Sequence, residues 1–546
     1  MIDILKNEVV FMSKNIKKIS ARTITLTIIF ILILIVIALL IGKFSYSYLA
    51  PTIDDDVEGV GEVTASGDTI IFTKGNTLSL SANADNFATG GSNLTATTNP
   101  KVKLMASSKT NSASSKYFAG IIIKNNTYFY TTDDKKPEVI LTVKDENGNL
   151  VTTSSDNLTF VTVNDNLQGF DITGVNGAFN IVTDHVIVTP SNKSEVIHTW
   201  TFTLTFVNLE TDQSENENST LEMDVVLQKN KLLTSIADFC ANGDNLNDCI
   251  VSTYNGLGEI SSIYYHNATL ANGTEDNSYR YAGANPNNYV CFGSDDETCP
   301  YENLFRIIGL IDGRIKLISS DGATIDMLGK EDEYNNSYGG SGRSKEYYKG
   351  SGDLLKMGIY RWDPKGTNAL STSSLYTTNL NTNFLTYLDG KNAKWKTMID
   401  DTTWYVGGMN TTNGTGINAK TAYDYEIGVN KDTISTLTAK IGLMYLTDFY
   451  YAAPSKYWIV KGNHYQRIND YSMSFKENWM SIGLDDWTIS KNTSYSYVVF
   501  YVAEDGASSY ISSIFPCIVR PVFNLISSIK YVSGSGTSEN PIRISL

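Results

Sequence analysis

Five cysteines are the residues whose spacing most directly suggests chemistry. Seven residues separate Cys291 from Cys299 in "NYVCFGSDDETCPYENLFRIIG", a spacing that fits neither a zinc knuckle nor a Cys-x-x-Cys redox motif. Thiols across a short loop oxidise readily outside a cell, so we expect disulfides Cys291–Cys299 and Cys240–Cys249. The apolar neighbours of Cys517, in "FPCIVRPV", favour a buried inert thiol over a nucleophile.

Motifs of known enzymatic chemistry are scarce. The chain has four histidines and lacks His-Glu-x-x-His, Gly-x-Ser-x-Gly and a phosphate loop. The paired carboxylates of a glycosidase usually lie far apart in sequence, so a wall-modifying or glycan-modifying enzyme stays open as an alternative. We predict no enzymatic activity and no cofactor.

Aromatic residues are the strongest binding candidates, because their ring faces can stack on the apolar faces of sugars. Six of the seven tryptophans follow residue 254, and most are expected in the core. Trp395 in "GKNAKWKT", and Trp404 with Tyr405 in "DDTTWYVGGMN", have polar neighbours. We therefore predict that these three residues form a ligand-binding surface.

The apolar segment "ITLTIIFILILIVIALLIG", residues 24–42, indicates on which side of a membrane the chain is expected to lie. Basic residues precede it and acidic residues follow it, which predicts a single transmembrane signal-anchor over 23–43. The cytoplasmic N-terminus is then 1–22, and the rest of the chain is extracellular at the plasma membrane. A cleaved signal peptide is the alternative. The net charge of −15 argues against nucleic acid as a partner.

Alternating hydrophobicity predicts a mainly β fold. After a stalk at 44–65, "HTWTFTLTFVNL" places Trp200 and Phe202 on one face of a strand, and similar patterns predict an immunoglobulin-like β-sandwich over 66–229. Turns are expected at Asn125–Asn126 and at Asn147–Gly148.

The sequence pattern changes after residue 229, where the regular alternation of apolar and polar residues ends. We expect a partly helical connector over 230–253 and a loop-rich α+β domain over 254–546. In this last part "LFRIIGLIDGRIKLIS" predicts a hairpin that turns at Asp312–Gly313.

Three segments of the last domain, "NYVCFG…LFRIIGLIDGRIKLI", "ENWMSIGLDDWTI" and "CIVRPVFNLISSIKYVSGSGTSENPI", resemble an uncharacterised family of surface proteins from gut-dwelling Gram-positive bacteria and their wall-less relatives. The resemblance extends to "GNTLSLSANADNFATGGSNLTATT" in the first half. Phe305 stands where that family usually has Trp. The family implies an anchor, a β-sandwich and a C-terminal domain.

The C-terminal pattern is more loosely similar to the C-type-lectin and formylglycine-generating-enzyme fold class. Lectin-type folds place ion sites near such loops, which makes Asp485 and Asp486 candidate Ca²⁺ ligands, although solvated turns are the favoured reading of the acidic clusters. The overall interpretation is a membrane-anchored, adhesin-like surface protein that binds an extracellular glycan or protein. A structural assembly subunit is the main alternative.

Overall fold

The structure is a computed structural model that describes residues 62–63, 68–107, 112–132, 134–329, 346–349, 355–409, 417–427, 434–460 and 477–546. The predicted segments 1–22 and 23–43, and nearly all of 44–65, lie outside these residues. Among the described residues, no helix has both the length and the apolar character that a membrane crossing requires. The described chain is mainly β, as predicted.

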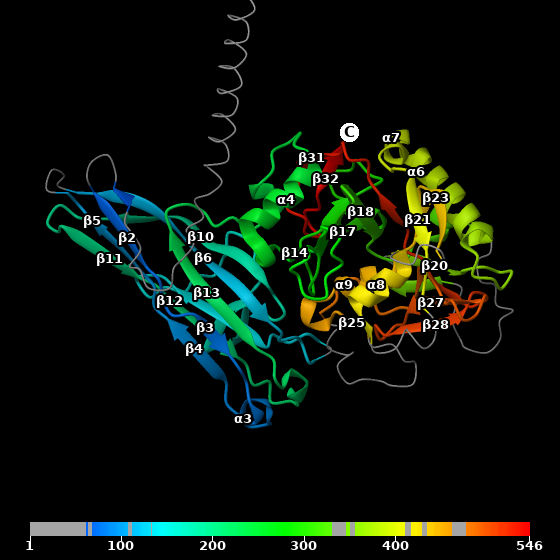
Figure 1. The fold of residues 1–546 in the computed structure, drawn as a ribbon. Coiled ribbons are helices and arrows are strands. Elements are labelled where there is room, and N and C mark those ends of the chain that lie inside the picture. The colour runs from blue at the N-terminus through cyan, green and yellow to red at the C-terminus, as the bar shows by residue number, and fades with distance from the viewer. Residues whose placement is uncertain are drawn as a thin grey trace, which may run out of the picture. The chain divides into compact units, whose positions relative to one another are not determined.

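The first part of the chain, to Gln228, consists of antiparallel sheets. One sheet has the order β1 (Glu62–Val63), β2 (Thr69–Thr73), β5 (Lys101–Met105), β11 (Glu195–Thr199). A second has the order β10 (Gly177–Val188), β6 (Ser114–Asn126), β13 (Leu221–Gln228), β3 (Leu78–Leu80). A third has the order β4 (Leu94–Thr98), β12 (Thr201–Phe206), β7 (Val139–Lys144), β9 (Leu167–Asp171), β8 (Phe160–Asn164). The long strands β6, β10 and β13 lie side by side (Figure 1).

The core of this part follows the predicted alternation. Trp200, Phe202, Leu204 and Phe206 are fully buried and belong to one hydrophobic cluster. The turn at Asn147–Gly148 is confirmed, because the backbone amide of Asp145 donates to the Asn149 carbonyl over 3.0 Å. The turn predicted at Asn125–Asn126 is wrong: both residues continue β6, where Asn126 pairs with Leu221 of β13.

The second part contains two larger sheets. One has the order β14 (Ile263–Tyr265), β15 (Tyr279–Tyr281), β17 (Leu304–Ile311), β18 (Arg314–Ser319), β30 (Val522–Asn524), β24 (Ile441–Gly442), with β16 (Tyr289–Cys291) also paired to β17. The other has the order β19 (Glu346–Lys349), β20 (Leu355–Arg361), β29 (Pro516–Ile518), β26 (Asp486–Lys491), β27 (Val498–Val502), β28 (Ser508–Ser512). Strands β26 and β29 pair in parallel.

Short two-stranded pairings and short helices complete the fold. The pairings are β21 (Thr402–Val406) with β23 (Ser435–Ala439), β22 (Ile417–Asn418) with β25 (Ile459–Val460), and β31 (Lys530–Ser533) with β32 (Arg543–Ser545). The α-helices are α3 (Ala84–Phe87), α4 (Leu246–Leu257), α5 (Ile325–Leu328), α6 (Leu385–Lys391), α7 (Ala393–Thr397), α8 (Ala419–Ile427) and α9 (Leu446–Tyr451). A π-helix, η6 (Leu375–Phe384), precedes α6, and the 3-10 helices are η1 (Ser214–Asn216), η2 (Ile236–Asp238), η3 (Gly258–Ser261), η4 (Tyr301–Asn303), η5 (Leu370–Thr372) and η8 (Ser455–Tyr457).

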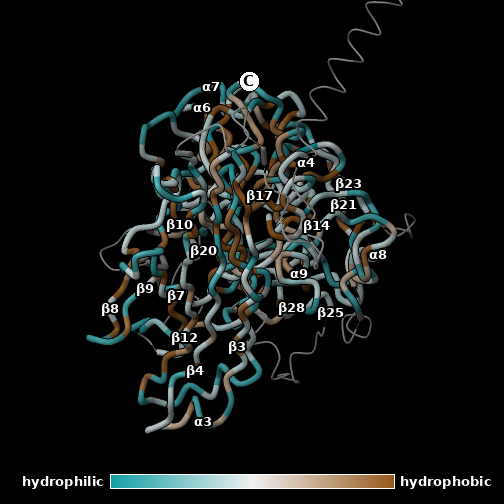
Figure 2. Tube along the Cα trace, turned by 90° about the vertical axis from the view of Figure 1, so that its left-hand side faces the viewer, coloured by the Kyte–Doolittle hydropathy of each residue, from teal (hydrophilic) through white to brown (hydrophobic). Residues whose placement is uncertain are grey.

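A second hydrophobic cluster lies in this part of the chain. It begins at Ile236 and includes Leu246 and Ile250, so the segment expected as a connector adds residues to the second core. The centre of the larger sheet is β17, whose residues are buried except at its last position. Figure 2 shows hydrophobic residues along β17.

Candidate functional site

A pocket of about 370 Å³ lies beside the strand pair β16–β17. Its lining residues come from segments far apart in sequence: Ala284, Tyr289, Tyr301, Leu304, Arg306, Ser320, Asp321, Asn478, Trp479, Ser481, Ile482 and Ser538. The segments 288–318, 477–489 and 517–542 all contribute to this lining. The pocket has the size of a small-molecule site, with aromatic rings and polar groups on its walls.

Arg306 is a buried cation at this pocket, on the otherwise apolar strand β17. Its Nε donates to Oδ1 of Asn288 over 2.8 Å, and its Nη2 donates to the carbonyl of Pro286 over 3.0 Å. The guanidinium lies 4.2 Å from the ring centre of Tyr289 and 4.6 Å from that of Trp479. Burial lowers the Arg306 pKa to about 10, so the group stays charged at neutral pH. These contacts fix the guanidinium as a rigid part of the wall.

Asp321 and Tyr301 form the acidic part of the pocket. The Tyr301 hydroxyl donates to Oδ2 of Asp321 over 2.6 Å. Burial and the nearby carboxylate raise the pKa of Tyr301, so its hydroxyl keeps the proton and remains a donor. Asp321 is buried, whereas 39% of Tyr301 is exposed. The pair thus presents a buried carboxylate next to an accessible ring.

Trp479 is held in place by its own polar contacts. The indole Nε1 donates to the Tyr281 carbonyl over 2.8 Å, and the backbone amide donates to the Gly283 carbonyl over 2.9 Å. Asn478 anchors the same turn, since its Nδ2 donates to the Phe449 carbonyl over 2.7 Å. A wall fixed in this way needs little ordering when a ligand binds.

Both predicted disulfides are present. Cys291–Cys299 has a Cα–Cα distance of 5.8 Å, and Cys240–Cys249 has one of 5.6 Å. The first closes the loop between β16 and η4, whose ends include Tyr289 and Tyr301 of the pocket. Cys517 is buried, as predicted.

The prediction that Trp395 and Trp404 lie at the surface is wrong. Trp395 is 2% exposed and its ring packs 5.2 Å from that of Phe292. Trp404 is 1% exposed, and Gly442 lies so close that an added Cβ would be 2.7 Å from the indole. Polar neighbours misled the prediction, because β21 alternates and places Tyr405 outward while Trp404 points inward. Tyr405 is exposed, and none of the three lines the pocket.

Asp485 and Asp486 have separate partners. Asp486 is buried, and its Oδ2 accepts from Nε of Arg520 over 2.6 Å, while burial raises its pKa to about 6. Asp485 accepts from the backbone amide of Glu504 over 3.1 Å. An ion pair already occupies one Asp486 oxygen, so these contacts give the predicted Ca²⁺ site no support.

The pocket residues Arg306, Asp321 and Tyr301 were not predicted. The available signal was a single arginine within an apolar strand, "LFRIIGLI", because a buried cation needs a special environment. No family model, curated protein or solved structure matches this chain.

Proposed function

We propose that this protein is a membrane-anchored surface protein whose C-terminal part binds the terminal sugar of an extracellular glycan. The observation on which this rests is the pocket formed by Tyr289, Tyr301, Arg306, Asp321 and Trp479. Sugars combine apolar ring faces with many hydroxyl groups, so they suit a pocket with aromatic walls and a charged acceptor.

The chemistry of the lining favours recognition over catalysis. Among the described residues that line the pocket, Asp321 is the single carboxylate. Glycoside hydrolysis normally needs two carboxyl groups that face the scissile bond. Asp321 instead serves as a hydrogen-bond acceptor for sugar hydroxyls, with Ser320 and Ser481 beside it. A charged acceptor of this kind adds both affinity and specificity.

The proposed architecture assigns this pocket to the extracellular part of the chain. The apolar segment 24–42 is the anchor, an immunoglobulin-like sandwich over 66–229 is the spacer, and a C-type-lectin-like domain contains the pocket. Loops on a rigid framework are common places for recognition. The protein then faces the outside of the cell, where its two disulfides are stable.

A role in assembly is the second candidate. Val186 and Val188 on β10, and Ile197 on β11, are exposed apolar side chains. Exposed apolar groups on strands favour contact with another protein surface. This alternative predicts self-association and no dependence on the pocket.

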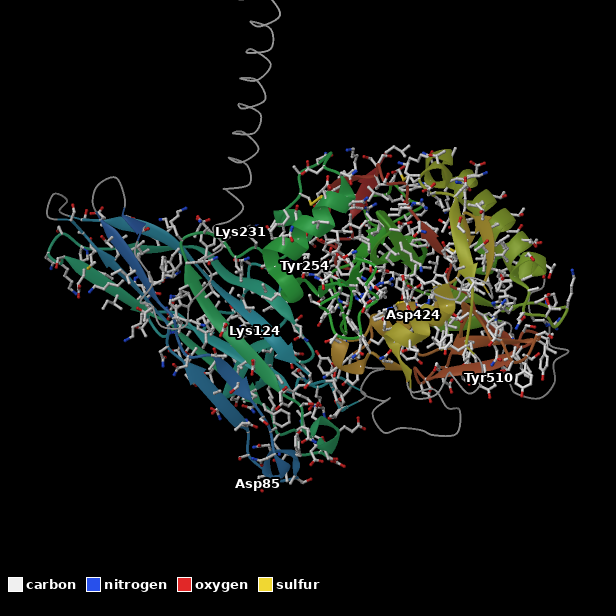
Figure 3. All side chains as sticks on the ribbon, in the orientation of Figure 1. Asp85, Lys124, Lys231, Tyr254, Asp424 and Tyr510 are labelled. Carbon is white, nitrogen blue, oxygen red and sulfur yellow. A yellow bond between two sulfur atoms is a disulfide. The ribbon has the colours of Figure 1, made fainter. Side chains whose placement is uncertain are left out.

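A glycan array probed with the full chain in detergent tests the proposal. We expect binding to a defined set of terminal sugars, weakened roughly tenfold to a hundredfold in Asp321→Asn, because a hydrogen bond to a charged group is lost. Tyr301→Phe should weaken binding less, since the ring remains. The controls are Asp505→Asn in an exposed turn and Tyr510→Phe on β28, whose side chain is exposed (Figure 3). Equal binding by Asp321→Asn and Asp505→Asn would reject the pocket as the glycan site.

A further inference from the structure

Three side chains with metal-binding atoms meet in the first part of the chain, far from the pocket in sequence. They are Glu146, His185 and His198, and one ligand atom from each lies within 4.8 Å of the other two. Nε2 of His185 is 2.9 Å from Oε2 of Glu146, and Nδ1 of His198 is 3.9 Å from the same oxygen. The side chains are largely buried, with exposed fractions of 16%, 23% and 12%.

The three residues come from two strands of different sheets and from a turn that follows a strand of the third sheet. Glu146 lies in the turn after β7, His185 lies on β10, and His198 lies on β11. A register shift of β10 against β6 falls between Val182 and His185, and irregularities of this kind re-aim a side chain. The backbone therefore directs the three groups to one point from independent elements.

The turn that presents Glu146 is well fixed. Gly148 has a φ of 78°, and its amide donates to the Asp145 carbonyl over 3.0 Å. The Asp145 carboxylate also accepts from the amides of Asn147 and Asn149 over 2.9 and 2.8 Å. This Asx-type turn holds Glu146 beside the two imidazoles: its Oε1 accepts from Nδ2 of Asn147 over 3.1 Å, and its Oε2 faces the histidines.

One ring nitrogen of His198 has the Tyr117 hydroxyl as a hydrogen-bond partner. Nε1 of Trp200 can only donate, and it donates to the Tyr117 hydroxyl over 2.7 Å. The Tyr117 hydroxyl is 2.9 Å from Nδ1 of His198 and donates to this nitrogen when the imidazole carries its proton on Nε2. In that tautomer Nδ1 of His198, 3.9 Å from Oε2 of Glu146, has a lone pair that a metal ion can use when the hydroxyl turns away.

We propose that Glu146, His185 and His198 bind a divalent transition-metal ion of the zinc class. Zinc bonds of about 2.0–2.1 Å imply about 3.3 Å between ligand atoms of a tetrahedral site, and the distances of 2.9 and 3.9 Å bracket this value. Imidazole nitrogens favour such ions over Ca²⁺ and Mg²⁺, which prefer oxygen ligands. Coordination requires the His185 proton on Nδ1 and rotation of the Tyr117 hydroxyl away from His198. Water completes the site.

The consequence is a metal cross-link between strands β10 and β11, which belong to different sheets, and the turn after β7. The sandwich part contains no cysteine, so a bound ion is its counterpart to the disulfides of the second part. An ion that binds the folded state alone stabilises it by mass action. This role is independent of the pocket and of its ligand.

A Co²⁺ titration of the chelator-stripped full chain in detergent tests the site. We expect one equivalent of Co²⁺ with the visible absorption of a four-coordinate ion, displaced by Zn²⁺ and unaffected by Ca²⁺. Glu146→Gln and His185→Gln should each bind at least tenfold more weakly. The matched control is Glu195→Gln, on the same strand as His198 but exposed.

A second variant keeps the test valid if the ligand variants fold poorly. Tyr117→Phe retains all three ligands and removes the hydroxyl that competes for Nδ1 of His198, so Co²⁺ should bind about fivefold more tightly. A cluster that is only a hydrogen-bond network gives no Co²⁺ absorption in the wild-type chain, and that result would overturn the proposal. Equal affinity of wild type, Glu146→Gln and His185→Gln would do the same.

Discussion

At the scale of single residues, the second core contains a buried acid with no direct cationic partner among its described contacts. Glu426 accepts hydrogen bonds from the amides of Leu446 and Thr447 over 3.0 and 3.1 Å, and from the hydroxyls of Thr447 and Ser490. Burial raises its pKa to about 7. The neighbouring Asp448 differs, because it pairs with Lys316 over 2.5 Å and Arg280 over 3.2 Å.

Glu426 should make stability depend on pH. Its pKa is about 7 in the folded state and 4.5 when unperturbed, so between these values the folded chain holds a proton that the unfolded chain releases. The free energy of unfolding should therefore fall as pH rises from about 4.5 to about 7, by at most roughly 3 kcal/mol, and then level off. Glu426→Gln should lose this contribution.

The measurement compares thermal midpoints at several pH values between 5 and 8. Tryptophan fluorescence suits it, since six of the seven tryptophans lie in the second part. The difference between wild type and Glu426→Gln isolates this residue from other titrating groups, and Glu504→Gln, an exposed acid, should show the wild-type profile. Parallel pH profiles for wild type and Glu426→Gln would show that the carboxyl is ionised throughout.

At the scale of elements, local turn chemistry was predictable where no distant strand opposed it. The turn at Asp312–Gly313 joins β17 and β18 as predicted, with φ of 51° and 68° at its two residues. Positive φ at both positions is typical of a type I′ turn. Asn125–Asn126 failed as a turn because pairing of β6 with β13 extends the strand through both residues.

Gly313→Ala should destabilise the hairpin by about 1–2 kcal/mol, because an alanine at a φ of 68° is strained. An added Cβ would have open space there, so the effect is conformational and not steric. Gly390→Ala is the matched control: its Cβ would also be in open space, and it lies in α6, where alanine is favoured by up to about 1 kcal/mol. Denaturant unfolding should show opposite signs for the two variants; equal effects would refute the explanation.

At the scale of the whole molecule, composition and periodicity predicted the β class and cysteine spacing predicted both disulfides. The pocket was not predictable, because Tyr289, Asp321 and Trp479 become neighbours only through tertiary pairing. The cluster of Glu146, His185 and His198 was not predictable for the same reason, since its residues come from two strands of different sheets and from a turn. The polar neighbours of Trp404 likewise did not indicate that it is buried. Successive side chains of a strand point to opposite faces, so an exposed neighbour says nothing about the burial of the residue beside it.

The distribution of disulfides predicts an uneven response to reduction. Both bridges lie after residue 229, and each closes a short loop, worth roughly 2–3 kcal/mol by the loop-entropy relation. Reduction should therefore loosen β16, η4 and α4, and weaken the proposed glycan binding through the loop between Tyr289 and Tyr301. Strands β6, β12 and β13 pack in a separate hydrophobic cluster and should keep their protection.

Hydrogen exchange of the full chain, with and without a reductant, measures this response segment by segment. Peptides from 289–306 and 240–257 should exchange faster after reduction, while peptides from β6 and β13 should not change. The double variant Cys291→Ser with Cys299→Ser should reproduce the first effect alone, because Cys240–Cys249 remains closed. Faster exchange throughout β6 and β13 would mean that the two cores unfold together, and no change near Cys291 would mean that the bridge contributes little to the pocket wall.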